Sequence, residues 1–355
     1  MGGTHQLFYK RISDVYDEEY QAHLEETKDE KYAKKMMQLS RFQIPEGCHW
    51  NDLRKHSKGA GQKLIKSFLE IEKANPDTLY DIFGDTNWGK LSDELMNELI
   101  EHFNKVNLSN KNLTSDLLGR SYEYLIKRFA DLSNKKAGEF YTPRSVTKLI
   151  TKILEPKDTE SIYDPACGTA GMLLEAVNYL KRNKKDHRTI TLYGQEKNVM
   201  SSGIARMNML LHGFEDTKIK QGDVLEEPMF LAGDKLQKFD VILANPPYSI
   251  KKWNQKGWRR DPYGRNIYGT PPKARADYAF IQHIIQSLSD KGRTAILLPH
   301  GVLFRDGEEK IRPKLVEDDK LETVIGLPEN MFYNSPMEAC IMIFRKNKTG
   351  KRKNH

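Results

Sequence analysis

The sequence is poor in cysteine and has no long apolar run. Its three cysteines, Cys48, Cys167 and Cys340, lie far apart and form no CxxC pair. Neither a disulfide framework nor a zinc site is therefore expected. No run of about 18 apolar residues occurs, and the polar start of the chain lacks the apolar region of a signal peptide. We expect a cytoplasmic protein that has no membrane-spanning segment and no bound metal.

Acidic residues are scarce in two segments of a chain whose net charge is +8. Residues 1–140 carry 21 basic and 23 acidic side chains, so the positive charge belongs to residues 141–355. Residues 249–276 hold eight basic residues and one acid, and residues 345–355 hold six basic residues and no acid. Contacts to phosphates require such clusters of Lys and Arg. Both segments are candidates for binding a polyanion, although a solvated loop and a frayed tail would give the same pattern.

Length and patterning indicate two domains, because 355 residues exceed one ordinary hydrophobic core. Residues 5–135 show apolar residues at helical spacing and little that resembles a strand. Helices are expected at Asp17–Leu39, Gly59–Glu72, Asp93–Asn104 and around 117–129. The predicted organisation is an all-helical N-terminal domain at 1–136, a second domain at 137–345 and a basic tail at 346–355.

The second domain alternates short β-branched runs with helical stretches, which is typical of a parallel sheet covered on both faces. The expected strands are Ser161–Tyr163, Thr189–Gly194, Lys218–Gln221, Phe239–Ala244, Thr294–Leu298, Glu322–Gly326 and Ala339–Phe344. The expected helices are Gly171–Lys184, Val199–Leu211, Asp277–Leu288 and Glu308–Val316. The last two strands are joined without a helical period, so we expect them to pair antiparallel. The predicted fold class is α/β, with a Rossmann-like seven-stranded domain after the helical one.

A glycine-containing turn, Asp164–Gly171, follows the first predicted strand. Doubly wound sheets bind cofactors at this position, where a strand ends and its helix begins. Gly168 and Gly171 permit backbone conformations and contacts that a Cβ would block, and Asp164 can hold a cation such as the ammonium of a methionine moiety. Taken alone, the turn is equally compatible with dinucleotide binding or with a tight turn of no function.

Acidic residues end the next two predicted strands. Glu196 follows the glycine turn by about 30 residues, where Rossmann-like folds hold ribose hydroxyls. Asp223 ends the third strand and can accept a hydrogen bond from an adenine amino group of the cofactor. Each acid alone is more often a helix cap or a loop residue. Two such acids beside a glycine turn favour a nucleotide-like cofactor site.

The fourth predicted strand runs directly into Asn245-Pro246-Pro247-Tyr248. An exocyclic amine of a base is a poor nucleophile, and two hydrogen-bond acceptors can draw its nitrogen toward tetrahedral geometry. The Asn245 side-chain oxygen and the Pro246 carbonyl can each accept one N–H, held in place by the rigid prolines. Tyr248 offers a flat face to a base that has left the duplex stack. The alternative is a proline-stiffened turn without function.

Together these motifs resemble the modification subunit of type I restriction-modification systems, a family of adenine-N6 DNA methyltransferases. The resemblance covers nearly the whole chain. It also rests on four further segments, at 138–144, 277–280, 301–305 and 326–332. The first of these precedes the glycine turn, as in the γ-type order of motifs.

The resemblance implies transfer of a methyl group from S-adenosylmethionine to the N6 amino group of adenine in DNA. The implied cofactor-binding residues are Glu139, Phe140, Tyr141, Thr142, Pro143, Arg144, Asp164, Gly168, Thr169, Ala170, Gly171, Glu196 and Asp223. The implied catalytic residues are Asn245, Pro246, Pro247 and Tyr248. In this family two modification subunits assemble with one specificity subunit, which reads the DNA, and a restriction subunit can join them.

Members of the family continue past the last strand into a helical tail, whereas this chain ends about ten residues after it, so we expect a truncated chain. One alternative is an Asn-Pro-Pro-Tyr methyltransferase of protein glutamine, ribosomal RNA or cytosine N4, which the helical domain and the 139–144 motif disfavour. A second alternative is a non-catalytic scaffold, which intact Asn245 and Tyr248 disfavour. Residues 249–276, with Trp253, Trp258, Arg259 and Arg260, are expected to become ordered on DNA and to contact its backbone.

Overall fold

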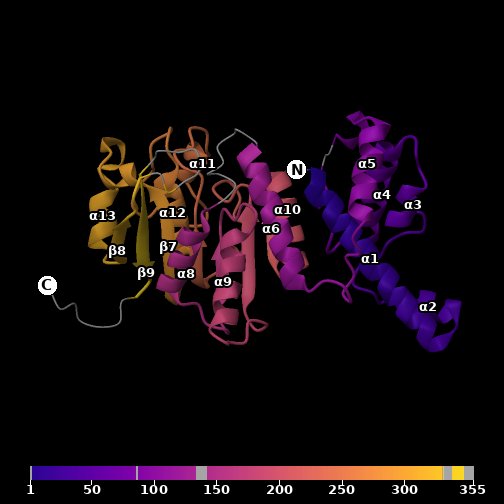
Figure 1. Cartoon of the computed structure of the whole chain (residues 1–355). Coiled ribbons are helices and arrows are strands. Elements are labelled where there is room, and N and C mark those ends of the chain that lie inside the picture. Colours follow the sequence, from indigo (N-terminus) through magenta and orange to yellow (C-terminus); the bar gives the residue numbers. More distant parts are fainter. Residues whose placement is uncertain (1, 85–86, 133–141, 330, 332–337, 348–355) are drawn as a thin grey trace. The chain divides into compact units, whose positions relative to one another are not determined.

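The computed structural model describes residues 2–84, 87–132, 142–329, 331 and 338–347. The chain divides into two compact units (Figure 1), one formed by residues 1–129 with 207–214, the other by residues 130–206 with 215–355. The domain boundary predicted at residue 136 lies outside the described residues, as does the predicted tail from residue 348 onward. None of the helices in the described ranges is long and apolar enough to cross a membrane.

The first unit is helical throughout its described part. Its elements are α1 (Gly2–Thr27), α2 (Glu30–Met37), α3 (Trp50–Arg54), α4 (Ala60–Ala74), the 3-10 helix η1 (Trp88–Lys90), α5 (Asp93–Asn104) and α6 (Ser115–Leu132). The single helix expected at Asp17–Leu39 is wrong. Lys28 has a left-handed φ of 53°, which ends α1, and the Asp29 side chain accepts hydrogen bonds from the Lys31 and Tyr32 N–H groups, which starts α2.

Residues 207–214 complete this helical unit by packing against α6. The Tyr122 hydroxyl of α6 donates to the Met207 Sδ at 3.2 Å, and both side chains are fully buried. A Cβ on Gly119 would lie 2.1 Å from the His212 imidazole, so the glycine allows the two segments to approach closely. The unit is therefore built from two stretches of chain that are distant in sequence.

The second unit contains a seven-stranded sheet in the order β3-β2-β1-β6-β7-β9-β8. Its strands are β1 (Ser161–Asp164), β2 (Thr191–Glu196), β3 (Lys218–Gln221), β6 (Phe239–Ala244), β7 (Leu288–Pro299), β8 (Leu321–Gly326) and β9 (Ala339–Arg345). Strand β9 runs antiparallel to both β7 and β8, while the other pairs are parallel. The predicted seven strands and the antiparallel final pair are confirmed.

The helices of this unit are α8 (Arg144–Leu154), α9 (Gly171–Arg182), α11 (Gln255–Trp258), α12 (Asp277–Gln286), α13 (Arg312–Glu317) and the first part of α10 (Val199–Leu211), whose residues from Met207 onward belong to the first unit. The 3-10 helices η2 (His300–Leu303) and η3 (Asp306–Glu308) follow β7. Sequence patterning missed α8, α11 and the small hairpin of β4 (Leu231–Ala232) and β5 (Lys235–Leu236). It also placed the start of α13 four residues too early, because Asp306–Glu308 forms a 3-10 turn.

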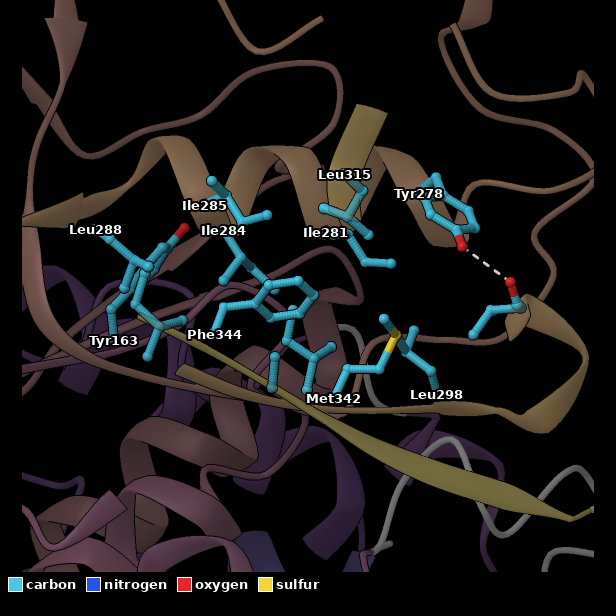
Figure 2. Close-up of a cluster of buried hydrophobic side chains, with 14 of the residues drawn as sticks. Tyr163, Tyr278, Ile281, Ile284, Ile285, Leu288, Leu298, Leu315, Met342 and Phe344 are labelled. Atoms are coloured by element: carbon cyan, nitrogen blue, oxygen red, sulfur yellow. Dashed lines mark hydrogen bonds between the residues drawn. The ribbon is translucent and has the colours of Figure 1, made fainter. Parts of the chain in front are cut away.

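Both faces of the sheet are covered. On one face, α12 side chains such as Ile281, Ile284 and Ile285 pack against Leu298, Met342 and Phe344 of the strands (Figure 2). In β6, Ile242 and Ala244 belong to this cluster, whereas the alternating Val241 and Leu243 are equally buried on the other face. Helices α8 and α9 contact β6 and supply that second cover. The carboxyl edge of the parallel strands is consequently the part of the sheet left for a site.

Candidate active site

The predicted site residues meet at the carboxyl edge of four adjacent parallel strands. Asp164 is the last residue of β1 and Glu196 the last residue of β2. Asp223 and Asn245 follow the ends of β3 and β6. Because these strands are neighbours in the order β3-β2-β1-β6, the sheet brings the four side chains to one edge.

The turn between β1 and α9 depends on two left-handed residues. Gly168 has φ 53° and Ala170 has φ 65°, while Thr169 between them is buried. The turn is fixed to β2, since the Cys167 N–H donates to the Gln195 carbonyl at 3.1 Å. The expectation for Gly171 is wrong in one respect: its φ is not left-handed, and a Cβ there would meet no atom of the chain within 4 Å. The structure therefore shows open space beside Gly171 and no steric need for a glycine there.

Gly194 is a residue that the sequence reasoning missed. A Cβ on it would lie 2.9 Å from the Cys167 Sγ, so this glycine of β2 lets the turn pack directly on the strand. A glycine in the middle of an apolar strand is the signal that indicates such a close approach.

Glu196 links the second strand to the glycine turn. Its carboxylate oxygens accept hydrogen bonds from the Gly168 N–H at 2.9 Å and the Asn198 N–H at 2.7 Å. Burial raises the pKa of Glu196, these backbone hydrogen bonds lower it, and the nearby Asp223 raises it further, so that the net shift is upward. Glu196 therefore holds the turn and still has lone pairs available for a hydroxyl ligand.

Asp164 and Asp223 differ in how their charge is compensated. Asp164 is 2% exposed, and its side chain accepts from the Ala166 N–H at 3.1 Å. Burial, with a smaller contribution from Glu196, raises the pKa of Asp164 to about 8. Asp223 accepts from the Leu225 N–H at 3.0 Å and from the Lys197 ammonium at 2.8 Å. Asp164 is thus the carboxylate that would gain most from a cationic ligand.

The Asn245 side chain is held from both ends. Its Nδ2 donates to the Thr142 Oγ1 at 2.8 Å, and its Oδ1 accepts from the Tyr248 hydroxyl at 2.9 Å. Burial raises the pKa of Tyr248, so its hydroxyl stays protonated. Thr142 comes from the segment that precedes α8 and lies 103 positions away from Asn245 in the sequence. The structure thus joins one predicted cofactor residue to the Asn245–Tyr248 loop.

The other residues predicted in the 139–144 segment are placed as follows. Pro143 is the N-cap of α8, and its carbonyl accepts from the Val146 and Thr147 N–H groups. Arg144 is the first residue of α8 and is exposed. Glu139, Phe140 and Tyr141 lie outside the described residues.

The basic segment 249–276 is partly folded against the chain itself. Trp258 is 1% exposed and packs with Val224, Leu225 and Phe280, so its expected role as a DNA contact is wrong in this conformation. Arg265 is 2% exposed, pairs with Asp261 at 2.6 Å and donates to the Val224 and Leu225 carbonyls. Lys251, Lys252, Lys256, Arg259, Arg260 and Lys273 remain exposed.

The helical unit followed by a seven-stranded sheet in this order matches the class I S-adenosylmethionine-dependent methyltransferase fold. The sequence profile of the N-6 DNA methylase family matches residues 113–355, and that of the HsdM N-terminal domain matches residues 5–120. The chain belongs to the N-6 DNA methylase family.

Individual relatives are similar in sequence to this chain along nearly its whole length. The type I restriction enzyme MjaVIII methylase subunit of Methanocaldococcus jannaschii is 34% identical over 98% of this chain and 62% of its own length. The crystal structure of the type I restriction-modification methyltransferase subunit of Streptococcus thermophilus is 31% identical, with a TM-score of 0.81, over 98% of this chain and 80% of that one. A structure from a study of complex assembly in the type I system is 25% identical, with a TM-score of 0.71, over 97% of this chain and 68% of that one. The chain spans about three fifths of the length of the first curated relatives.

Proposed function

We propose that the chain transfers a methyl group from S-adenosylmethionine to the N6 amino group of adenine in DNA. The observation that carries this proposal is the Asn245–Tyr248 loop, which lies at the same sheet edge as Asp164, Glu196 and Asp223. Membership of the N-6 DNA methylase family supports the choice of an adenine in DNA over other amines.

The residues at the edge fit S-adenosylmethionine. Asp164 is a buried carboxylate whose raised pKa shows that its charge is poorly compensated, and the ammonium of the methionine moiety would supply that compensation. The empty space beside Gly171 leaves room at the start of α9. Glu196 can accept from the ribose hydroxyls and Asp223 from the adenine amino group. Bound in this way, the cofactor supplies an electrophilic methyl group.

The chain's own residues then act on the acceptor amine. The Asn245 Oδ1 and the Pro246 carbonyl accept its two N–H groups, which localises the nitrogen lone pair toward the methyl group. Thr142 fixes the orientation of the Asn245 amide from the opposite side. The Tyr248 ring provides the surface on which the extruded base stacks. Thr142, Pro143 and Arg144, with Glu139, Phe140 and Tyr141 before them, are proposed to complete the cofactor pocket.

For partners, we propose assembly with a separate specificity subunit, two copies of this chain to one copy of that subunit, and with a restriction subunit. The relatives are named methylase subunits of type I restriction enzymes, and one related structure comes from work on the assembly of that system. Exposed basic residues of the 249–276 segment are proposed to contact the DNA backbone.

The test is methyl transfer by the full chain with its specificity subunit, measured with radiolabelled S-adenosylmethionine and with mass spectrometry of the modified nucleoside. N6-methyladenine is expected, whereas N4-methylcytosine would reassign the substrate. Asn245→Ala should lower the rate at least ~100-fold and leave cofactor binding within about threefold, because it removes one of two amine acceptors. Asn183→Ala is the control, since this exposed side chain caps α9 far from the site. A rate of methyl transfer in Asn245→Ala equal to that of the wild-type chain would contradict the proposed mechanism.

A further inference from the structure

A second network holds the end of the catalytic loop, formed by side chains that none of the site assignments above uses. Ser249 follows Tyr248 directly and has a left-handed φ of 52°, which residues other than glycine rarely adopt. Such a conformation persists only where the surrounding structure enforces it. The contacts of Ser249 therefore identify what determines the shape of the loop.

The N–H and the hydroxyl of Ser249 are both engaged by one ion pair. Its N–H donates to the Asp277 Oδ1 at 3.0 Å, and its Oγ accepts from the Arg305 Nη1 at 3.2 Å. The Arg305 Nη2 donates to the Asp277 Oδ2 at 2.8 Å. Asp277 begins α12, and Arg305 follows β7 and η2. Three distant segments thus meet at one residue of the loop.

The pair is buried and held rigidly. The Asp277 side chain is 1% exposed and that of Arg305 is 13% exposed. The fully buried Glu308 holds the same guanidinium, with ion-pair distances of 3.1 Å to Nη2 and 3.2 Å to Nε, and the Arg312 guanidinium donates to the Arg305 carbonyl. A planar guanidinium can donate to Asp277, Ser249 and the Glu308 Oε2 at once, a geometry that an ammonium does not reproduce.

A hydrogen bond beside the ion pair ties the same two segments together. The Tyr278 hydroxyl donates to the Val302 carbonyl at 2.9 Å, the contact drawn as a dashed line in Figure 2. Tyr278 and Val302 belong to the cluster that packs α12 on the sheet. The segments that carry Asp277 and Arg305 are therefore anchored to this core.

We propose that Asp277 and Arg305 are positioning residues, which fix the backbone at Ser249 and so place the Pro246 carbonyl and the Tyr248 ring for methyl transfer. The inference rests on the proposed function and adds to it the two residues that determine the conformation of the loop. In this proposal both residues act through Ser249. A displacement of about 1 Å at a reacting group can cost about 100-fold in rate.

The matched control is another buried ion pair of the same compact unit. Arg293, in the middle of β7, pairs with Glu160, the residue before β1, at 2.8 Å, and their side chains are 10% and 16% exposed. Arg293 also donates to the Leu154 carbonyl at 2.6 Å, so its removal breaks a comparable set of contacts. Arg293→Ala and Arg305→Ala should therefore lower the melting temperature to a similar extent.

The experiment compares both variants in the full chain by single-turnover methyl transfer, cofactor binding and amide hydrogen exchange over residues 245–250. Arg305→Ala should lower the single-turnover rate about 100-fold, leave the cofactor Kd within about threefold and accelerate exchange at Ser249. Arg305→Lys should recover part of the rate. Arg293→Ala should leave the rate per folded molecule within about threefold and leave exchange over 245–250 unchanged.

Unchanged exchange over 245–250 in Arg305→Ala, or an equal loss of rate in Arg293→Ala, would overturn the inference. If Arg305→Ala fails to fold, Asp277→Asn provides the same test, because it keeps an acceptor for the Ser249 N–H and removes the charge that holds Arg305. If hydrogen exchange is accelerated in the Arg305→Ala or Asp277→Asn variant, the ion pair does hold the loop. If the wild-type chain nevertheless forms no N6-methyladenine, the result contradicts the proposed function and not the role of the ion pair.

Discussion

The Tyr248 hydroxyl donates a hydrogen bond to the Asn245 Oδ1 at 2.9 Å. Asn245 Oδ1 is the atom proposed to accept an N–H of the target amine, so in the chain alone an internal donor occupies it. An incoming base has to displace or share this hydrogen bond. Tyr248 therefore has two separable features, a ring on which a base can stack and a hydroxyl that competes for the acceptor.

Substitution of Tyr248 separates these features. Tyr248→Phe keeps the ring, so we expect a methyl transfer rate within about threefold of wild type. Tyr248→Ala removes the stacking surface, which is worth about 1–3 kcal/mol per base, and should weaken productive DNA binding about 10-fold to 100-fold. Steady-state kcat and KM for DNA measure both effects. Equal losses in the two variants would show that the hydroxyl is essential and would contradict this division of roles.

Asp164 makes the stability of the chain without cofactor depend on pH in a defined direction. Burial raises its pKa to about 8 from an ordinary value of 3.8, so the folded chain retains a proton that the unfolded chain has lost. The contribution of Asp164 to stability is therefore greatest below pH 4 and falls as the pH rises toward 8. Asp164→Asn should raise the melting temperature of the free chain at pH 9 by ~2 °C or more, with no gain at pH 4.

The same substitution should weaken S-adenosylmethionine binding about 10-fold or more, since it removes a charged acceptor for the ammonium. Asp240→Asn is the control for stability. Burial raises the pKa of Asp240, but hydrogen bonds from Ser161 and Ser289 lower it more, so the net shift is downward. Asp240→Asn should therefore not raise the melting temperature of the chain at pH 9. Melting curves at several pH values test the expected change in stability, and calorimetric titration tests the expected loss of S-adenosylmethionine affinity. An Asp164→Asn variant that melts below the wild-type chain at pH 9 would refute the expected gain in stability.

The exposed cations of segment 249–276 should contribute to the salt dependence of DNA binding. Replacing Lys251, Lys252, Arg259 and Arg260 by Gln should reduce the slope of log K against log salt by up to about 3–4, since each phosphate contact contributes about 0.9. Lys157, Lys184, Lys185 and Lys291 are exposed near the amino ends of the strands, and replacing them is the charge-matched control. A slope that changes equally in both quadruple variants would mean that only net charge matters.

The sheet, and the meeting of the candidate site residues at one of its edges, could be predicted because both depend on local patterns. Apolar runs fix the strands, and residues that follow parallel strands must meet at one edge, as Asp164, Glu196 and Asn245 do. Side-chain pairing between distant segments could not be predicted. Thr142 reaches Asn245 across 103 positions, and Arg305 reaches Ser249 across 56. Neither contact has a signal in spacing or composition.

The burial of Trp258 and Arg265 escaped sequence reasoning for a related reason. A count of basic residues treats every Arg as a surface charge, whereas Arg265 is surrounded by Asp261, two backbone carbonyls and the Trp258 ring. Its neighbours in three dimensions, Val224 and Leu225, follow β3 some 40 positions earlier. Whether a cation binds a ligand or stabilises its own fold depends on such partners.

Residues 207–214, which cover α6 in the helical unit, have a consequence for synthesis of the protein. Tyr122 and Leu118 are buried in the finished chain, and Met207 and His212 are among the residues packed against that helix. A ribosome adds roughly 5–20 residues per second, so the nascent helical segment waits for several seconds before these residues emerge. During that interval the part of α6 that these residues later cover stays exposed to solvent.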